Sequence, residues 1–147
     1  MTPESPVTAI DLEIDSRLEN VSLLGSAVRG ALATVLPDDQ LFHWELCVVE
    51  AASNCVSHAY SGEAGHRVRV EVTIRPDRVE VRVVDSGRPA PVDRRAGGLP
   101  TFDANDLSTL AESGRGMFLI DSLVDSMAFD SAAGRNTLTL VKSRATG

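Results

Sequence analysis

Residues 44–60 read WELCVVEAASNCVSHAY, and this stretch combines the pattern of a buried helix with regularly spaced polar residues. Most of its positions are small or branched apolar residues, but Glu50, Asn54 and His58 recur at intervals of four. In an α-helix this interval keeps side chains on one face, with a drift of about 40° at each step. The sequence therefore predicts a helix with an apolar face in the core and a second face that carries a carboxylate, an amide and an imidazole.

Two of these polar residues, Glu50 and His58, also have a purely structural explanation. Glu50 taken alone could be a solvated residue, and His58 could cap or pack against the helix end. The stretch contains no lysine or arginine with which Glu50 could pair. A metal site of Glu50, His58 and His66 is a further alternative, but this spacing matches no common zinc motif.

Composition limits the class of protein. The chain has 147 residues, 43% of them apolar and 24% charged, which predicts one globular domain. Its net charge of −7 argues against general binding to nucleic acid or anionic membranes and favours a partner with a basic surface. No apolar run could span a bilayer and no leader opens the chain, so we expect a cytoplasmic protein.

Cys47 and Cys55 lie about 12 Å apart on one predicted helix, too far for a disulfide, and we expect both to be buried.

Alternating and helical patterns predict the remaining elements. Ser16 followed by Glu19 is typical of a capping box, which begins a helix that Pro37 ends. The expected elements are a strand at 7–15, helices at 17–36 and 37–61, strands at 67–74 and 78–85, a loop at 88–113, a helix at 114–127 and a hairpin at 127–142 with its turn near Gly134 and Asn136. This order predicts an α/β two-layer sandwich, with a mixed, mostly antiparallel sheet covered on one face by helices.

Two further motifs could bind a ligand. Asp85 and Gly87 follow a strand in the segment VVDSGRP, where a carboxylate could accept a hydrogen bond from an exocyclic amino group beside a glycine that admits a flat ring. Gly114 and Gly116 open a helix, and exposed amides at a helix start bind phosphate well. Taken separately, the first motif could be an ordinary turn and the second could simply end a loop.

The order of these motifs resembles that of the GHKL family of ATP-binding domains, and within it the small serine kinases and anti-sigma factors of the RsbW and SpoIIAB type. EAASNCVSHAY looks like the N box of the family, VVDSG like its first glycine box, SGRGMFLIDSLVDSM like its second, and GRNTLTLVK like its closing strand. The resemblance implies a Bergerat ATP-binding fold formed by a single domain over residues 1–147, with an ATP lid at about 88–113.

The resemblance also implies a role for each matching residue. Glu50 would be the catalytic base, and Asn54 would hold a Mg²⁺ ion that bridges the ATP phosphates. The adenine amino group would donate to Asp85, while Gly87 would give clearance. The expected ligands of the phosphates are Gly114, Arg115 and Gly116, and the expected further adenine contact is Thr137.

A glutamate at position 50 and the lack of room for a phospho-acceptor helical domain favour a protein serine/threonine kinase over a sensor histidine kinase. In the family, such kinases phosphorylate an anti-anti-sigma protein of the STAS fold, sequester a sigma factor and commonly form homodimers. Two alternatives stay open: a nucleotide-binding anti-sigma module without kinase turnover, and a switch kinase that acts on a scaffold protein and activates a phosphatase.

The first glycine box, DSGRPAP, departs from some relatives because it lacks a second glycine. Arg94 and Arg95 in the expected lid could reach phosphates or be solvated.

Overall fold

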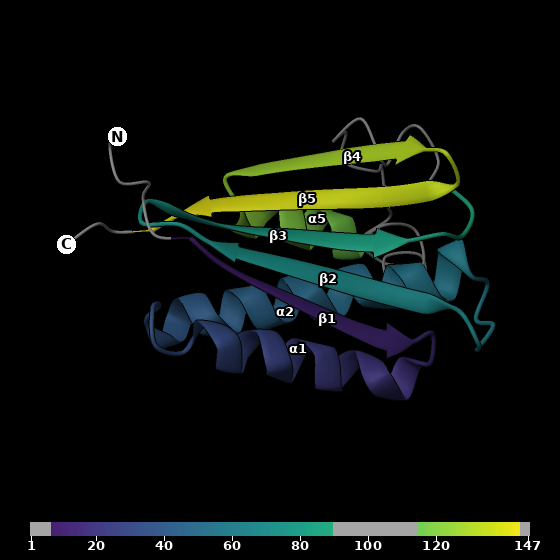
Figure 1. The fold of residues 1–147 in the computed structure, drawn as a ribbon, viewed down its shortest axis with the longest axis horizontal. Coiled ribbons are helices and arrows are strands. Elements are labelled where there is room, and N and C mark those ends of the chain that lie inside the picture. Colours follow the sequence, from purple (N-terminus) through teal and green to yellow (C-terminus); the bar gives the residue numbers. More distant parts are fainter. Residues whose placement is uncertain (1–6, 90–114, 145–147) are drawn as a thin grey trace, which may run out of the picture.

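A five-stranded antiparallel sheet with helices on one face forms the described part of the chain (Figure 1). The computed structural model describes residues 7–89 and 115–144. The elements are β1 (Thr8–Asp15), α1 (Leu18–Leu32), α2 (Asp38–Asn54), the π-helix η1 (Cys55–Ala59), β2 (Arg67–Ile74), β3 (Arg78–Asp85), α5 (Arg115–Leu123), β4 (Ser126–Ala132) and β5 (Arg135–Ser143).

The strands lie in the order β1-β2-β3-β5-β4, and every neighbouring pair is antiparallel. The β2–β3 hairpin is closed by the backbone bond from Arg75 N to Arg78 O, 2.9 Å, at the predicted turn around Pro76. The mostly antiparallel sheet predicted from the sequence is confirmed.

The helices α1, α2 and α5 lie along one face of the sheet (Figure 1). Alternate strand residues are buried in the core between the sheet and these helices. Val70 of β2 and Leu140 of β5 are fully buried, as is Trp44 of α2. The fully buried strand and helix residues also include Leu24, Val28, Leu32, Val48, Val68, Val72, Val79 and Ile120. The predicted two-layer sandwich is therefore confirmed, and α2 is the helix that turns a second face away from this core.

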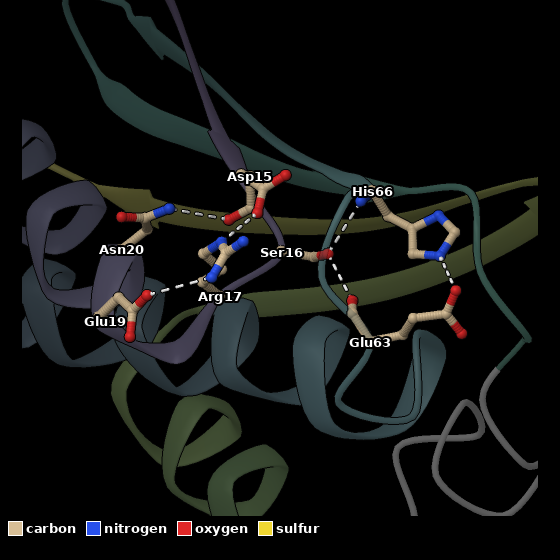
Figure 2. Close-up of polar contacts among 7 residues, drawn as sticks. All are labelled: Asp15, Ser16, Arg17, Glu19, Asn20, Glu63 and His66. Atoms are coloured by element: carbon tan, nitrogen blue, oxygen red, sulfur yellow. Dashed lines mark hydrogen bonds and ion pairs between the residues drawn. The ribbon is translucent and has the colours of Figure 1, made fainter.

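The capping box predicted at Ser16 is wrong. The N-cap of α1 is Arg17, and it makes no side-chain capping bond. The Ser16 side chain is fully buried, and its hydroxyl donates to the Glu63 carbonyl at 2.7 Å and accepts from the His66 amide at 3.1 Å (Figure 2). These bonds link the β1–α1 junction to the loop before β2, so tertiary contacts outcompete the local cap.

Other sequence-based predictions can also be compared with the structure. Cys47 and Cys55 are free and buried, as expected. The helix after the loop is shorter than predicted, because α5 ends at Leu123 and β4 begins at Ser126. The β4–β5 turn lies at Ala133 and Gly134, both with positive φ, so Asn136 belongs to β5 instead of the turn.

Of the expected lid, residues 90–113 lie outside the described residues, Arg94 and Arg95 among them. Within the described ranges, no helix is long and apolar enough to cross a membrane.

Candidate functional site

The polar face of α2 ends in a change of helix type. Glu50 and Asn54 are half-buried on the last turn and a half of α2, and the π-helix η1 begins directly after Asn54. The bond from Tyr60 N to Cys55 O, 2.9 Å, spans five residues and widens this turn. Short π-helical turns occur often at functional sites. His58 lies in this wider turn and is exposed, so only Glu50 and Asn54 share the regular α-helical face.

The first turn of α5 packs against Glu50 and Asn54. Gly116 is buried there, and a Cβ at this position would lie 2.7 Å from Glu50 Oε2 and 3.6 Å from Asn54 Nδ2. The structure thus brings the carboxylate and the amide of one predicted motif together with the helix start of another. Gly114 lies outside the described residues, and Arg115 is described only as the first residue of α5.

Asp85 is the second centre of the site. Its side chain is 7% exposed at the end of β3, and its Oδ1 accepts from Gly87 N at 2.9 Å and from Asn136 Nδ2 at 2.7 Å. The Cys55 side chain lies close enough to Asp85 for the charge of the carboxylate to act on the thiol. Burial, together with the negative charge of Asp85, raises the pKa of Cys55 well above its usual range.

Among the described residues, the donors to Asp85 leave its carboxylate able to bind a further donor. A carboxylate has about four lone-pair directions, and within that part of the chain Asp85 accepts from two nitrogen donors. Both nitrogen donors share Oδ1. An exocyclic amino group is a chemically suitable partner for the remaining capacity, so the residues present fit an adenine base.

Gly87 is required by a backbone contact. A Cβ at Gly87 would lie 2.6 Å from the carbonyl carbon of Ala59, the last residue of η1, and the adjacent Arg88 N donates to Ala59 O at 2.9 Å. Ser86 N donates to the Tyr60 hydroxyl at 2.7 Å, which adds a second tie between the same segments. The contact with η1 alone explains why a glycine stands here, and clearance for a flat ring stays a prediction.

The structure does not bring Thr137 together with Asp85. Thr137 pairs with Val84 of β3, and Asp85 pairs with Asn136. Because successive strand residues point to opposite faces, Thr137 lies on the sheet face away from the helices. Asn136, which the sequence interpretation assigned to the turn, is the β5 residue that contacts Asp85. The alternation with Leu138 and Leu140, both buried, was the sequence signal that could have found it.

The two centres are joined through α2 and η1, because Asn54 next to Gly116 is followed directly by Cys55 next to Asp85. Within the described residues, no group of three or more His, Cys, Asp or Glu side chains could hold a metal ion. The donor set still suits Mg²⁺, which binds through one or two protein oxygens and completes its shell with waters and substrate phosphates. The Asn54 amide oxygen could serve as an oxygen ligand of that kind.

Comparison with known proteins agrees with this arrangement. Residues 14–142 match the histidine kinase-like ATPase domain, and the chain belongs to this family. The match runs from the last two residues of β1 almost to the end of β5 and therefore includes both centres of the site. Membership in an ATPase domain family implies that the nucleotide is ATP.

Several curated proteins that are similar to this chain are serine-protein kinases named RsbW. The chain is 33% identical over 109 residues to serine-protein kinase RsbW of Listeria monocytogenes, covering 74% of this chain and 67% of the relative. It is 28% identical over 130 residues to RsbW of Bacillus velezensis, covering 87% and 81% of the two chains, and 25% identical over 127 residues to RsbW of Bacillus subtilis, covering 85% and 79%.

A solved structure shares the fold. The crystal structure of the RsbU and RsbW domains of Rv1364c from Mycobacterium tuberculosis matches with a TM-score of 0.65 and 18% sequence identity. The match covers 96% of this chain but only 34% of that longer chain. At this identity, the likeness supports the architecture and not a particular activity.

Proposed function

We propose that this protein is an ATP-dependent protein serine/threonine kinase and anti-sigma factor, which phosphorylates a STAS-type anti-anti-sigma protein and sequesters a sigma factor. The observation that carries the proposal is the contact of Gly116 with Glu50 and Asn54. This contact between α2 and the first turn of α5, in a chain of the histidine kinase-like ATPase domain family, supports the roles of Glu50 as base and of Asn54 as Mg²⁺ ligand. The similarity to the serine-protein kinases named RsbW supports the same function.

In this proposal, Asp85 holds the adenine end of ATP. The carboxylate is fixed by Gly87 N and Asn136 Nδ2 on one oxygen, and it accepts the adenine amino group with its remaining lone pairs. A charged hydrogen bond of this kind contributes about 1.5 to 3 kcal/mol. Thr137 lies on the other face of the sheet, so we assign the β5 contribution to Asn136 and exclude Thr137 from the proposed base site.

The phosphate end is assigned to the first turn of α5 and to Asn54. The free amides at a helix N-terminus favour phosphate oxygens, and Gly116 offers no side chain to obstruct them. The proposed segment comprises Gly114, Arg115 and Gly116. Asn54 would hold Mg²⁺ through its amide oxygen, and the ion would supply neutralisation of phosphate charge.

Glu50 is the proposed general base. Its carboxylate lies within one turn of Asn54 on α2, at the start of α5, and would accept the proton of the attacking serine hydroxyl. Phosphoryl transfer depends mainly on positioning and charge stabilisation, and a positioned base contributes about 10²–10⁴-fold. A site of this small size therefore suffices for the reaction.

The proposed partners are proteins. A net charge of −7 favours a basic surface on the sigma factor and argues against direct contact with nucleic acid. We also propose a cytoplasmic location without membrane attachment and a homodimeric state, both from the resemblance to small anti-sigma kinases.

The test combines phosphoryl transfer with capture of partners. The protein is incubated with ATP, Mg²⁺ and STAS-domain proteins of its host, and phosphoserine is mapped by mass spectrometry. In parallel, the immobilised protein captures host proteins with and without ATP. We expect serine phosphorylation of one STAS protein and capture of a sigma factor. Nucleotide binding without transfer to any partner would favour a binding module without turnover, and capture of a phosphatase without a sigma factor would favour a switch kinase that acts on a scaffold protein.

A further inference from the structure

The side-chain amide of Asn136 connects β5 to the end of β3 and to the residues that follow it. Asn136 is only 2% exposed. Its Nδ2 lies 2.7 Å from Asp85 Oδ1, 3.0 Å from the Gly87 carbonyl and 3.4 Å from the Arg88 carbonyl. Because an amide nitrogen carries two hydrogens, the two shorter contacts use its full donor capacity.

The orientation of this amide is determined by its neighbours. The three groups around Nδ2 are a carboxylate and two carbonyls, which accept hydrogen bonds and cannot donate them. On the other side, the Ser131 hydroxyl of β4 donates to Asn136 Oδ1 at 2.7 Å. A flipped amide would place an oxygen against three acceptors, so the hydrogen-bond network fixes a single orientation.

All polar atoms of Asn136 are thus engaged within the protein, and the residue is buried. It can therefore influence a ligand only through the groups that it holds. The group with the greatest rotational freedom is the Asp85 carboxylate, because the last torsion of an aspartate is broad. Donors from Asn136 and from Gly87 N on the same oxygen fix the plane of the carboxylate and the direction of its other oxygen.

We propose that Asn136, itself oriented by Ser131, is a positioning residue that fixes the Asp85 carboxylate and thereby determines which purine base the site selects. This inference rests on the proposed function, in which Asp85 accepts from the exocyclic amino group of adenine. A carboxylate held in one plane discriminates between a base with an amino group and a base with a carbonyl at that position. A carboxylate free to rotate can turn away from the carbonyl, so selectivity falls.

The test compares the affinities of ATP and inosine triphosphate, which carries an oxygen in place of the adenine amino group. Calorimetry measures both dissociation constants for the parent, Asn136→Ala, Ser131→Ala and the control Thr139→Ala, which lies on the opposite face of β5. We expect the parent to prefer ATP by about 10-fold or more. In Asn136→Ala the preference falls to about 3-fold or less, Ser131→Ala is intermediate, and Thr139→Ala matches the parent.

The ratio of the two dissociation constants separates a positioning role from a general structural role. Structural damage weakens the binding of both nucleotides equally and leaves this ratio unchanged. An Asn136→Ala variant that keeps the parental ratio overturns the inference while the proposed function stands. If that variant does not fold, Ser131→Ala decides the test, and a parental ratio there has the same meaning. A parent that binds the two nucleotides equally overturns the assignment of Asp85 to adenine, and the role of Asn136 with it.

Discussion

A Cβ at Gly116 would lie 2.7 Å from Glu50 Oε2, so a side chain at the start of α5 would require the carboxylate of α2 to move. This relationship joins two sequence motifs that lie more than sixty residues apart in the chain. It also makes the geometry around Glu50 depend directly on the residue at position 116.

Replacing Gly116 by alanine should therefore impair phosphoryl transfer without unfolding the protein. The new methyl group displaces the Glu50 carboxylate, and we expect the rate of transfer to fall by about 10-fold or more. Alanine is favoured over glycine inside a helix by about 1 kcal/mol, so stability should be maintained.

The matched control is Gly30→Ala in α1, where no atom lies within 4 Å of the added Cβ. This variant should transfer phosphate at the parental rate. Single-turnover kinetics measure both variants, and a Gly116→Ala rate equal to that of the control would show that the carboxylate position is unimportant.

Gly87→Ala should destabilise the fold. The added Cβ would lie against the carbonyl of Ala59, and both groups belong to backbone that is tied together by the Arg88 N to Ala59 O bond. Relief of such overlap costs about 1–3 kcal/mol. Urea unfolding measures the loss, with Ser86→Ala as the control because that neighbouring side chain is exposed. Equal stabilities of the two variants would refute the packing explanation of Gly87.

Ser16→Ala should also lower stability, although the residue does not cap α1. The substitution removes the acceptor of the His66 amide and the donor to the Glu63 carbonyl (Figure 2). We expect a loss of about 2 kcal/mol in the free energy of unfolding. Ser22→Ala on the exposed side of α1 should change it by less than about 0.5 kcal/mol, and a similarly small effect at Ser16 would contradict the role of this junction.

The buried thiols should be inert in the folded protein. Burial raises the pKa of Cys47 from 9.0 to about 12, and the pKa of Cys55 is also raised. Neither thiol should react with iodoacetamide at pH 8 unless the chain is unfolded in urea. The folded state holds the protons more tightly than the unfolded chain, so stability is intact below pH 9 and declines as the pH rises from 9 toward 12. Rapid alkylation of folded protein at pH 8, or stability that rises over that range, would contradict this prediction.

The sheet and its core could be predicted from the sequence because the residue patterns that determine them lie within short, continuous segments. Alternation of valines in 67–74 and 78–83 predicts which strand residues are buried, and the structure confirms it. Val84 lies outside this alternation and is buried as well. Glu50 and Asn54 could be paired for the same reason, since an interval of four within an α-helix determines a shared face.

The parts that could not be predicted depend on contacts between distant segments. The π-helical turn of η1 lies where Ala59 and Tyr60 bind the backbone of Arg88 and Ser86. Ser16 matched a local capping pattern, but its hydroxyl is used by a loop almost fifty residues later. In each case a tertiary hydrogen bond outcompeted a local pattern.

Asn136 shows the same limit in the site itself. Its residue type suits a turn, and only the alternation with Leu138 and Leu140 places it in the strand, facing the helices. The family resemblance implied that the adjacent Thr137 contacts adenine. A shift of one residue in a strand moves a side chain to the other face of the sheet.

Glu50 is the proposed base of a protein kinase whose nucleotide is held by Asp85 and, through Mg²⁺, by Asn54. The most direct measurement is the rate of phosphoryl transfer from ATP to a STAS-domain partner by the parent and by Glu50→Gln, with ATP affinity measured on the same samples. We predict that transfer falls by about 10²–10⁴-fold in Glu50→Gln while the dissociation constant for ATP changes by less than about 3-fold. Transfer by Glu50→Gln at the parental rate, with ATP still bound, would show that Glu50 is not the base.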